Sequence, residues 1–205
     1  NGTIVFSAEE DPTLYENGMK KKKDDTRVVD DVLHTPPVRL FRLSVTDKKV
    51  TRLTENDDWI DGWSVSPDGK WAATIHEQYL SYQWDNRIPP KTFLYDLTTG
   101  ERKLVSTDER FRPMLVRWAK DASGFYAIAP YTTHPKFYMA SILLLYFYDT
   151  AAGALKKVEL DWENGLGFGF ETTKDGFVAI LPRGVYRQPA KYVRSGDAWQ
   201  RTNID

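Results

Sequence analysis

The 205-residue chain contains no cysteine, which excludes disulfide bonds and thiol chemistry and leaves cytoplasmic, periplasmic and secreted locations equally open. Its charges are balanced, with 28 lysines and arginines against 29 aspartates and glutamates, so the sequence indicates no bulk attraction to nucleic acid or to a membrane surface. The longest apolar run, residues 139–148, is about half of the roughly 18 to 20 residues that a membrane-spanning helix requires. We therefore expect neither a nucleic acid nor a membrane as partner.

Groups for catalysis and metal binding are equally scarce. The three histidines, His34, His76 and His134, lack the short spacings of zinc ligands, so we expect them in surface loops and expect no metal or cofactor. The segment nearest to a Gly-x-Ser-x-Gly nucleophile motif, residues 62–66, ends in serine and falls in an expected strand. Alternate glycines in residues 165–169 precede a strand instead of the helix that a dinucleotide site needs, so we expect them to permit close packing. The sequence predicts no catalytic residue.

Three stretches of the chain repeat one pattern at a nearly constant interval. Each has an apolar strand-like run, a tight turn with an aspartate, and a second run rich in apolar and aromatic residues. The turn aspartates, Asp68, Asp121 and Asp175, lie 53 and then 54 positions apart. A second motif, an aromatic run ending in aspartate with a glycine four residues later, recurs after 53 positions at Asp96 and Asp149. Two motifs in phase indicate one structural unit copied along the chain.

Each copy is expected to form four short strands, named a to d here in chain order, joined as two hairpins. This period and strand count are typical of one blade of a β-propeller, in which radially packed four-stranded antiparallel sheets cover one another. We expect an all-β chain of about four blades that belongs to a larger propeller, because the first copy lacks strand a. The predicted blades cover residues 1–54, 59–105, 113–158 and 166–201.

Function is expected on the side of the propeller where the b–c connections emerge. The a–b and c–d turns are short, whereas three b–c connections, residues 7–39, 76–91 and 130–141, are long, and long loops on a rigid scaffold commonly carry functional residues. Aromatic and charged side chains in two of them are typical of interface anchors, although they could equally fold back and cap the blades. The residues predicted to face a substrate or partner are Tyr79, Tyr82, Trp84, Arg87, His134 and Tyr138.

Two charged clusters have a functional and a simpler interpretation. Asp57, Asp58 and Asp61 precede strand a of the second copy, where paired carboxylates could exchange protons or recognise the α-amino group of a peptide. A solvated d–a connection explains them more simply. The lysine run at residues 20–23 could dock a partner, but Asp24 and Asp25 follow it directly, so a solvated loop is the simpler interpretation.

The sequence resembles two groups of propellers. The Ser-Pro-Asp-Gly-Lys box at residues 66–70 resembles the repeat of Tol-type and peptidase-associated propellers. The opening segment is similar to the first blades of prolyl-oligopeptidase-family serine peptidases, especially acylaminoacyl- and dipeptidyl-peptidase-like members. It carries an acidic stretch at residues 9–12, the lysine run, acidic residues at 24–31, and strands at 40–44 and 50–54. The resemblance covers nearly the whole chain.

The resemblance to the peptidases implies a function for the whole protein. In that family the propeller precedes an α/β-hydrolase domain with a Ser-Asp-His triad, and none of that second domain lies in this sequence. The propeller stacks on the hydrolase domain and restricts entry, so that only short or unfolded peptides reach the catalytic serine. The implied partners are therefore a hydrolase domain of the same parent chain and peptide substrates. The alternative is a stand-alone Tol-like propeller that acts as a protein-binding adaptor, and in either case a homo-oligomer is left open.

Overall fold

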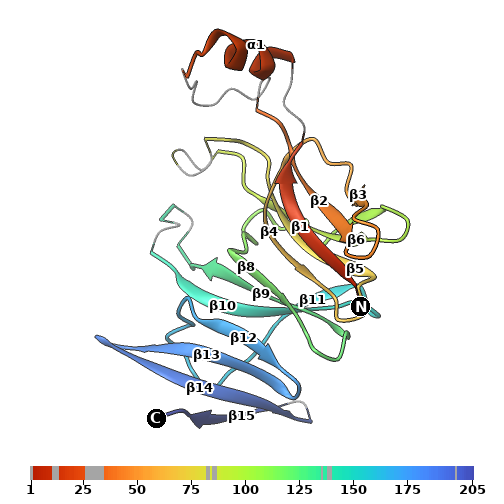
Figure 1. Ribbon diagram of the computed structural model, residues 1–205. Coiled ribbons are helices and arrows are strands. Elements are labelled where there is room, and N and C mark those ends of the chain that lie inside the picture. Colours follow the sequence, from red (N-terminus) through yellow and green to blue (C-terminus); the bar gives the residue numbers. More distant parts are fainter. Residues whose placement is uncertain are drawn as a thin grey trace.

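The computed structural model describes residues 2–10, 14–25, 35–81, 84, 87–134, 136–137, 140–196 and 198–205. Strands dominate these residues, and they contain one helix, α1 (Leu14–Lys22). The strands form one seven-stranded sheet and two four-stranded sheets. The seven-stranded sheet divides into two antiparallel sheets joined by one parallel pair, so that four antiparallel sheets follow one another along the chain as an open arc (Figure 1). No helix in the described part of the chain is long and apolar enough to cross a membrane.

The first two sheets carry the N-terminal half of the chain. The first contains β1 (Thr3–Glu9), β2 (Val38–Ser44) and β3 (Val50–Arg52). The second contains β4 (Trp59–Val65), β5 (Trp71–Glu77), β6 (Lys91–Asp96) and β7 (Arg102–Leu104). A single parallel pair, Val38 with Trp59, joins these two sheets, whereas the neighbours within each sheet are antiparallel. Strand a is thus present in the second sheet as β4, and β1 of the first sheet occupies the position of strand b.

The other two sheets repeat the same order without any strand pairing between them. The third contains β8 (Leu115–Trp118), β9 (Gly124–Tyr131), β10 (Ile142–Asp149) and β11 (Ala154–Lys157). The fourth contains β12 (Phe170–Thr173), β13 (Gly176–Arg183), β14 (Tyr186–Ser195) and β15 (Ala198–Asn203). The expectation of successive four-stranded antiparallel sheets in an almost purely β chain is therefore confirmed.

The turn aspartates occupy equivalent a–b turns and stabilise them in the same way. In the turn between β4 and β5, Asp68 accepts hydrogen bonds from the Ser66 hydroxyl at 2.5 Å and the Lys70 N–H at 3.1 Å. Asp121 accepts from the Ser123 N–H at 3.0 Å between β8 and β9. Asp175 accepts from a threonine hydroxyl at 2.9 Å between β12 and β13. A short carboxylate that binds its own turn explains why aspartate recurs there.

Hydrogen bonds also connect equivalent a strands across the sheets. The N–H of Trp118 donates to the hydroxyl of Ser64 at 2.9 Å, and the hydroxyl of Thr172 donates to the carbonyl of Trp118 at 3.0 Å. Each pair is 54 positions apart, so the repeat of the sequence becomes a line of contacts in space. These bonds are buried or partly buried, where the loss of one partner would leave a polar atom unsatisfied.

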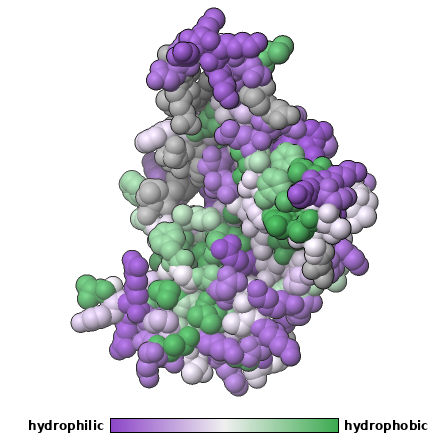
Figure 2. Space-filling model, in the orientation of Figure 1, coloured by the Kyte–Doolittle hydropathy of each residue, from purple (hydrophilic) through white to green (hydrophobic). Residues whose placement is uncertain are grey.

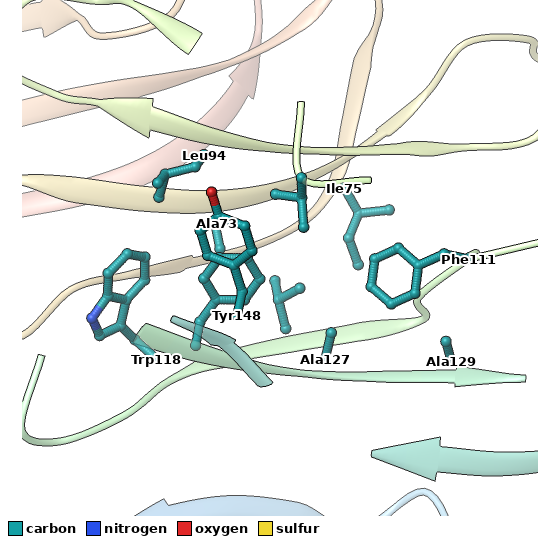
Figure 3. Close-up of a cluster of buried hydrophobic side chains, with 11 residues drawn as sticks. Ala73, Ile75, Leu94, Phe111, Trp118, Ala127, Ala129 and Tyr148 are labelled. Carbon is teal, nitrogen blue, oxygen red and sulfur yellow. The ribbon is translucent and has the colours of Figure 1, made fainter. Parts of the chain in front are cut away.

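The core lies between successive sheets, and the b strands supply both of its faces. Ala73 and Ile75 of β5 pack toward Ala127 and Ala129 of β9, with Trp118 and other large side chains around them (Figure 3). The alternate residues of β9, including Tyr126 and Ile128, face the fourth sheet instead. Because strand side chains alternate with period two, a strand buried on both faces must be apolar at nearly every position. Small alanines at these positions allow the sheets to approach closely.

Two local features differ from the sequence-based expectation. The lysine run was expected in a loop, but Lys20, Lys21 and Lys22 form the last turn of α1, and Lys23 ends it with a positive φ of 55°. Basic side chains near a helix C-terminus interact favourably with its dipole, which explains their place. The fourth sheet has no long b–c connection, because β13 and β14 are joined by a tight turn at Gly184, whose φ is 59°. The sequence pattern predicts the third strand of this blade at residues 191–194, whereas β14 already begins at Tyr186.

Candidate functional site

The b–c connections lie together on one side of the molecule. In Figure 1 the helix α1, the β5–β6 and β9–β10 connections and the tip of the β13–β14 hairpin lie at the top and left, opposite the short a–b and c–d turns. Of the residues predicted there, Tyr79, Trp84 and Arg87 lie between β5 and β6, and His134 lies between β9 and β10. Tyr82 and Tyr138 lie outside the described residues.

The predicted anchors of the β5–β6 connection form a local aromatic and cationic contact. The guanidinium of Arg87 lies 5.1 Å from the centre of the Tyr79 ring and donates a hydrogen bond to its hydroxyl. The side chain of Trp84 in the same connection is 73% exposed. An exposed tryptophan beside such a pair fits an interface anchor better than a cap.

His134 organises its own loop and faces a groove. Its Nδ1 accepts hydrogen bonds from the backbone N–H groups of Lys136 at 3.1 Å and Phe137 at 3.2 Å, and its ring lies 4.5 Å from the ring of Phe137. His134 is also one of the residues that line this groove.

The groove lies between the third and fourth sheets on the side of the b–c connections, and its volume is about 1460 Å³. Its walls come from residues 106–114, the facing ends of β9 and β10, β11, residues 164–169, and the β13–β14 hairpin. Its floor includes Tyr146, which packs edge-on against Phe111 with ring centres 5.2 Å apart. Burial raises the pKa of the Tyr146 hydroxyl, which therefore remains a neutral hydrogen-bond donor.

Glycines make one wall of this groove possible. A Cβ on Gly165 would lie 2.7 Å from the carbonyl oxygen of Leu143, and a Cβ on Gly169 would lie 2.4 Å from the side chain of Ile180. The N–H of Gly167 donates to the carbonyl of Ile180 at 2.7 Å. The close packing expected for these glycines is thus present, and it brings this segment against both β10 and β13.

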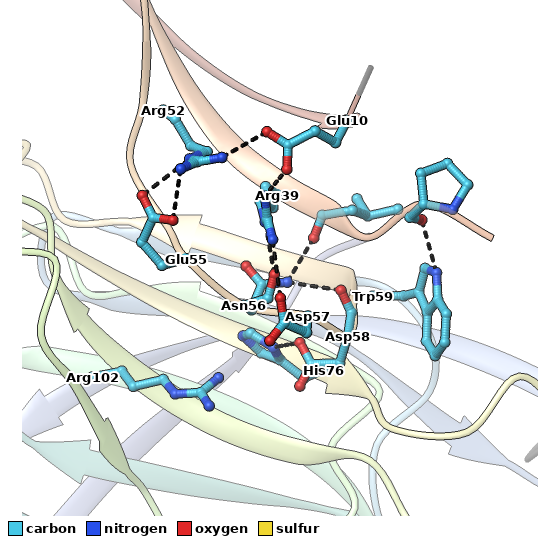
Figure 4. Close-up of polar contacts among 12 residues, drawn as sticks. Glu10, Arg39, Arg52, Glu55, Asn56, Asp57, Asp58, Trp59, His76 and Arg102 are labelled. Atoms are coloured by element: carbon cyan, nitrogen blue, oxygen red, sulfur yellow. Dashed lines mark hydrogen bonds and ion pairs between the residues drawn. The ribbon is translucent and has the colours of Figure 1, made fainter. Parts of the chain in front are cut away.

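A second polar site, in the second sheet, contains the carboxylate of Asp58. His76 was expected in a surface loop, but it lies in β5 and is completely buried. Its Nδ1 lies 2.5 Å from the carboxylate of Asp58, and its Nε2 lies 2.9 Å from the hydroxyl of Thr74 (Figure 4). Phe93 and Tyr95 enclose the ring, with centres 4.9 and 5.7 Å away. His76 is buried because side chains in a strand alternate with period two, which places His76 with Thr74 on one inward-pointing face of β5.

The environment of Asp58 favours its charged form. Desolvation is the largest single influence and acts to raise its pKa. The hydrogen bond and the charge of His76, with hydrogen bonds from Gln78 at 2.7 Å and from Asn56, outweigh that influence, so the pKa lies below its ordinary value of 3.8. Asp58 is therefore ionised at neutral pH and anchors a hydrogen-bonded chain of three side chains.

The three hydrogen-bonded side chains of Asp58, His76 and Thr74 are connected like a catalytic triad, but a substrate cannot reach them. Hydroxyl, imidazole and carboxylate follow one another as in serine hydrolases. Thr74 and His76 are both fully buried, however, and the Thr74 hydroxyl also lies 3.3 Å from the carbonyl oxygen of Phe93. A nucleophile must reach a substrate atom, and no substrate can approach this hydroxyl. The arrangement satisfies buried polar groups and holds the second sheet to the preceding connection.

Asp57 and Asp61, the other acidic residues of the cluster, have different surroundings. The Asp57 side chain is 98% exposed and lies 3.1 Å from the guanidinium of Arg39, which also binds Glu10 and the carbonyl of Asn56. Asp61 lies within β4, at the irregularity between Ile60 and Gly62, and does not precede the strand as expected. Neither residue lines the groove. No group of three or more His, Asp or Glu side chains suited to a metal ion occurs among the described residues.

The residues of the groove were largely missed in the sequence. Met114, Phe168 and Tyr186 come from separate connections, and only His134 belongs to the predicted set. The sequence contained one local indication of the groove: Phe168 is a large apolar residue between two glycines just before a strand.

Three solved structures have a similar fold at low sequence identity. Pyrococcus horikoshii acylaminoacyl peptidase is 13% identical with a TM-score of 0.62, and the match covers 100% of this chain and 31% of that chain. The β-propeller domain of the Trilobed protease from Pyrococcus furiosus, which has an open velcro topology, is 10% identical with a TM-score of 0.58, and 100% and 54% are covered. TolB from Acinetobacter baumannii is 16% identical with a TM-score of 0.56, and 81% and 37% are covered.

Comparisons of the sequence with known proteins identify no family for this chain. No protein-family model matches the chain, and no curated protein matches it. The chain spans between about a third and about half of the length of these three structures. Identities this low establish the fold alone. The chain therefore has a β-propeller fold of the kind found in propeller domains of peptidases and in TolB.

Proposed function

We propose that this chain is the non-catalytic β-propeller portion of a serine peptidase of the acylaminoacyl-peptidase type. In this role it gates or positions peptide substrates for a separate α/β-hydrolase domain. The observation that carries the proposal is the groove of about 1460 Å³ on the side of the b–c connections, since a gate needs an accessible surface that can hold a peptide.

The comparisons support a peptidase without deciding it. The match to acylaminoacyl peptidase extends over the whole chain, whereas the match to TolB covers 81% of it. Thr74 and His76 are fully buried, so the Asp58–His76–Thr74 hydrogen-bonded series cannot act as a catalytic triad. A division of labour between a propeller that selects peptides and a second domain that cleaves them accounts for both observations.

The long connections supply the selecting surface in this proposal. Trp84 is largely exposed, Arg87 and Tyr79 form a fixed pair, and His134 faces the groove. Large aromatic and arginine side chains contribute most of the binding energy of typical interfaces. Tyr82 and Tyr138 remain part of the proposed set because they belong to the same connections.

A protein-binding adaptor is the second candidate. The match to TolB, which covers 81% of the chain, favours it. The same exposed connections would then bind a protein partner instead of a substrate.

The protein made from the complete reading frame tests both candidates. We expect it to react with a fluorophosphonate probe for active-site serines and to hydrolyse short N-acetylated peptides faster than long ones. The 205-residue chain alone serves as the control and should do neither. Absence of both probe labelling and hydrolysis in the complete protein would contradict the peptidase and favour the adaptor.

A further inference from the structure

The charges of the groove between the third and fourth sheets are not balanced. Four basic side chains line it, and one acidic side chain, Asp108, does so. The chain as a whole has nearly equal numbers of basic and acidic residues. The basic residues are Arg110, Arg112, Lys157 and Arg187.

Local contacts account for only part of this positive charge. Arg110 lies 3.3 Å from Asp108, and Lys157 lies 2.9 Å from Glu159, which does not line the groove. Arg187, in contrast, is exposed beside the tip of the β13–β14 hairpin and has no side-chain partner within the described part of the chain. The groove therefore presents cationic groups at both ends, on residues 106–114 and on the hairpin, and favours an anionic ligand.

Apolar side chains stand exposed between these cations. Phe168 is 80% exposed, Tyr186 is 75% exposed and Met114 is 57% exposed, and all three line the groove. Figure 2 shows hydrophobic surface beside hydrophilic surface in the lower half of the molecule, where the third and fourth sheets lie. Exposed apolar side chains gathered in one hollow mark an interaction site more often than isolated ones do.

The size and lining of the groove discriminate between ligand classes. Typical small-molecule pockets hold about 300 to 1,000 Å³, and this groove exceeds that range. A nucleic acid would need a denser row of cations to neutralise its phosphates, and aliphatic residues such as Met114 and Ile142 would be left without partners. An extended polypeptide supplies apolar and charged side chains in alternation, which matches a groove lined by both.

We propose that this groove binds an extended peptide segment that carries both acidic and apolar side chains. The proposal rests on the proposed function only in taking a peptide as the ligand. Acidic side chains of the peptide meet Arg187, the basic residue of the groove without a side-chain partner among the described residues. Its apolar side chains cover Phe168 and Tyr186. For the complete protein this makes acidic peptides the preferred substrate class.

Direct binding to the 205-residue chain tests the proposal. A fluorescent peptide of alternating leucine and glutamate should bind, and the same peptide with lysine in place of glutamate should bind at least about tenfold more weakly. Affinity for the acidic peptide should also fall as the salt concentration rises. A labelled single-stranded DNA oligonucleotide is the competing polyanion and should bind more weakly than the acidic peptide.

Matched charge reversals locate the binding. Arg187→Glu should weaken binding of the acidic peptide about fivefold, which corresponds to about 1 kcal/mol. Lys174→Glu, in the a–b turn at the opposite end of the same sheet, should leave the affinity unchanged. Phe168→Ser should weaken binding through the lost apolar contact. Both groove residues are exposed, so circular dichroism and melting temperature should match those of the unsubstituted chain.

Four outcomes would overturn the proposal: no binding of the acidic peptide, equal binding of the lysine peptide, tighter binding of the DNA, or equal effects of the two charge reversals. None of them bears on serine labelling of the complete protein. If the complete protein hydrolyses peptides but the groove does not bind the acidic peptide, the acidic-peptide site is contradicted and the proposed peptidase function stands. If the groove binds the acidic peptide but the complete protein is not labelled at a serine, the site stands and the adaptor function is favoured.

Discussion

Removal of the carboxylate that holds His76 should destabilise the fold strongly. In Asp58→Ala, the Nδ1–H of His76 loses its acceptor at 2.5 Å, and the ring is fully buried, so water cannot replace it. An unsatisfied buried donor costs about 1 to 3 kcal/mol. Gln78 also loses a charge-assisted bond at 2.7 Å, so we expect a total near 3 kcal/mol. In a chain of this size that corresponds to a melting temperature lower by about 6 to 12 °C.

The adjacent residue provides a matched control. Asp57→Ala removes an equal side chain with the same charge, but that side chain is 98% exposed, and its partner Arg39 keeps Glu10 and the carbonyl of Asn56. An exposed ion pair contributes about 0 to 1 kcal/mol. Urea denaturation of the unsubstituted chain and both variants at neutral pH measures the difference.

The same pair of variants makes a prediction for pH. Because the pKa of Asp58 is lowered in the folded chain, its contribution is fully present above the unfolded pKa, which is about 3.9, and is lost as the pH falls through the folded pKa. The gap in unfolding free energy between the unsubstituted chain and Asp58→Ala should therefore narrow below about pH 4. Equal stability of the Asp57 and Asp58 variants, or a gap that widens in acid, would refute the structural role assigned to the buried chain.

Three further substitutions test the packing and the proposed gate. Gly124→Ala should cost about 3 kcal/mol in urea denaturation, because its Cβ would lie 2.0 Å from a backbone carbonyl oxygen of β10. Gly18→Ala in α1, with nothing within 4 Å, should not lower stability, because alanine favours a helix over glycine. Phe177→Ala should cost about 4 kcal/mol because this side chain is completely buried, and Phe168→Ala should cost less than about 0.5 kcal/mol; similar costs would contradict the described core. In the complete protein, Trp84→Ala should raise KM for peptides about fivefold with an unchanged melting temperature. A lower melting temperature with an unchanged KM would instead indicate that Trp84 folds back on the blades and stabilises the fold.

The candidate sites were predictable only in part. The long connections follow directly from the spacing of strand-like runs, which correctly placed Tyr79, Trp84, Arg87 and His134 outside the strands. The groove did not follow, because its walls come from segments far apart in the sequence that are brought together by the packing of two sheets.

The buried histidine shows the same limit. Strand period places Thr74 and His76 on one face of β5, but a sequence does not say which face is turned to the interior. Asp58 lies 18 positions before His76, and its approach depends on the path of the connection before β4.

By itself the sequence determined the repeat, the aspartate turns and the alternation of side chains along each strand. These features are local or strictly periodic: a carboxylate binds its own turn, and alternate side chains face alternate sheets. Only the tertiary structure decided which repeats form a groove, that His76 is buried beside Asp58, and that β13 and β14 form a tight hairpin where the other sheets carry long connections. Those features depend on distances between residues far apart in the chain, and such distances are set by the packing of one sheet against the next.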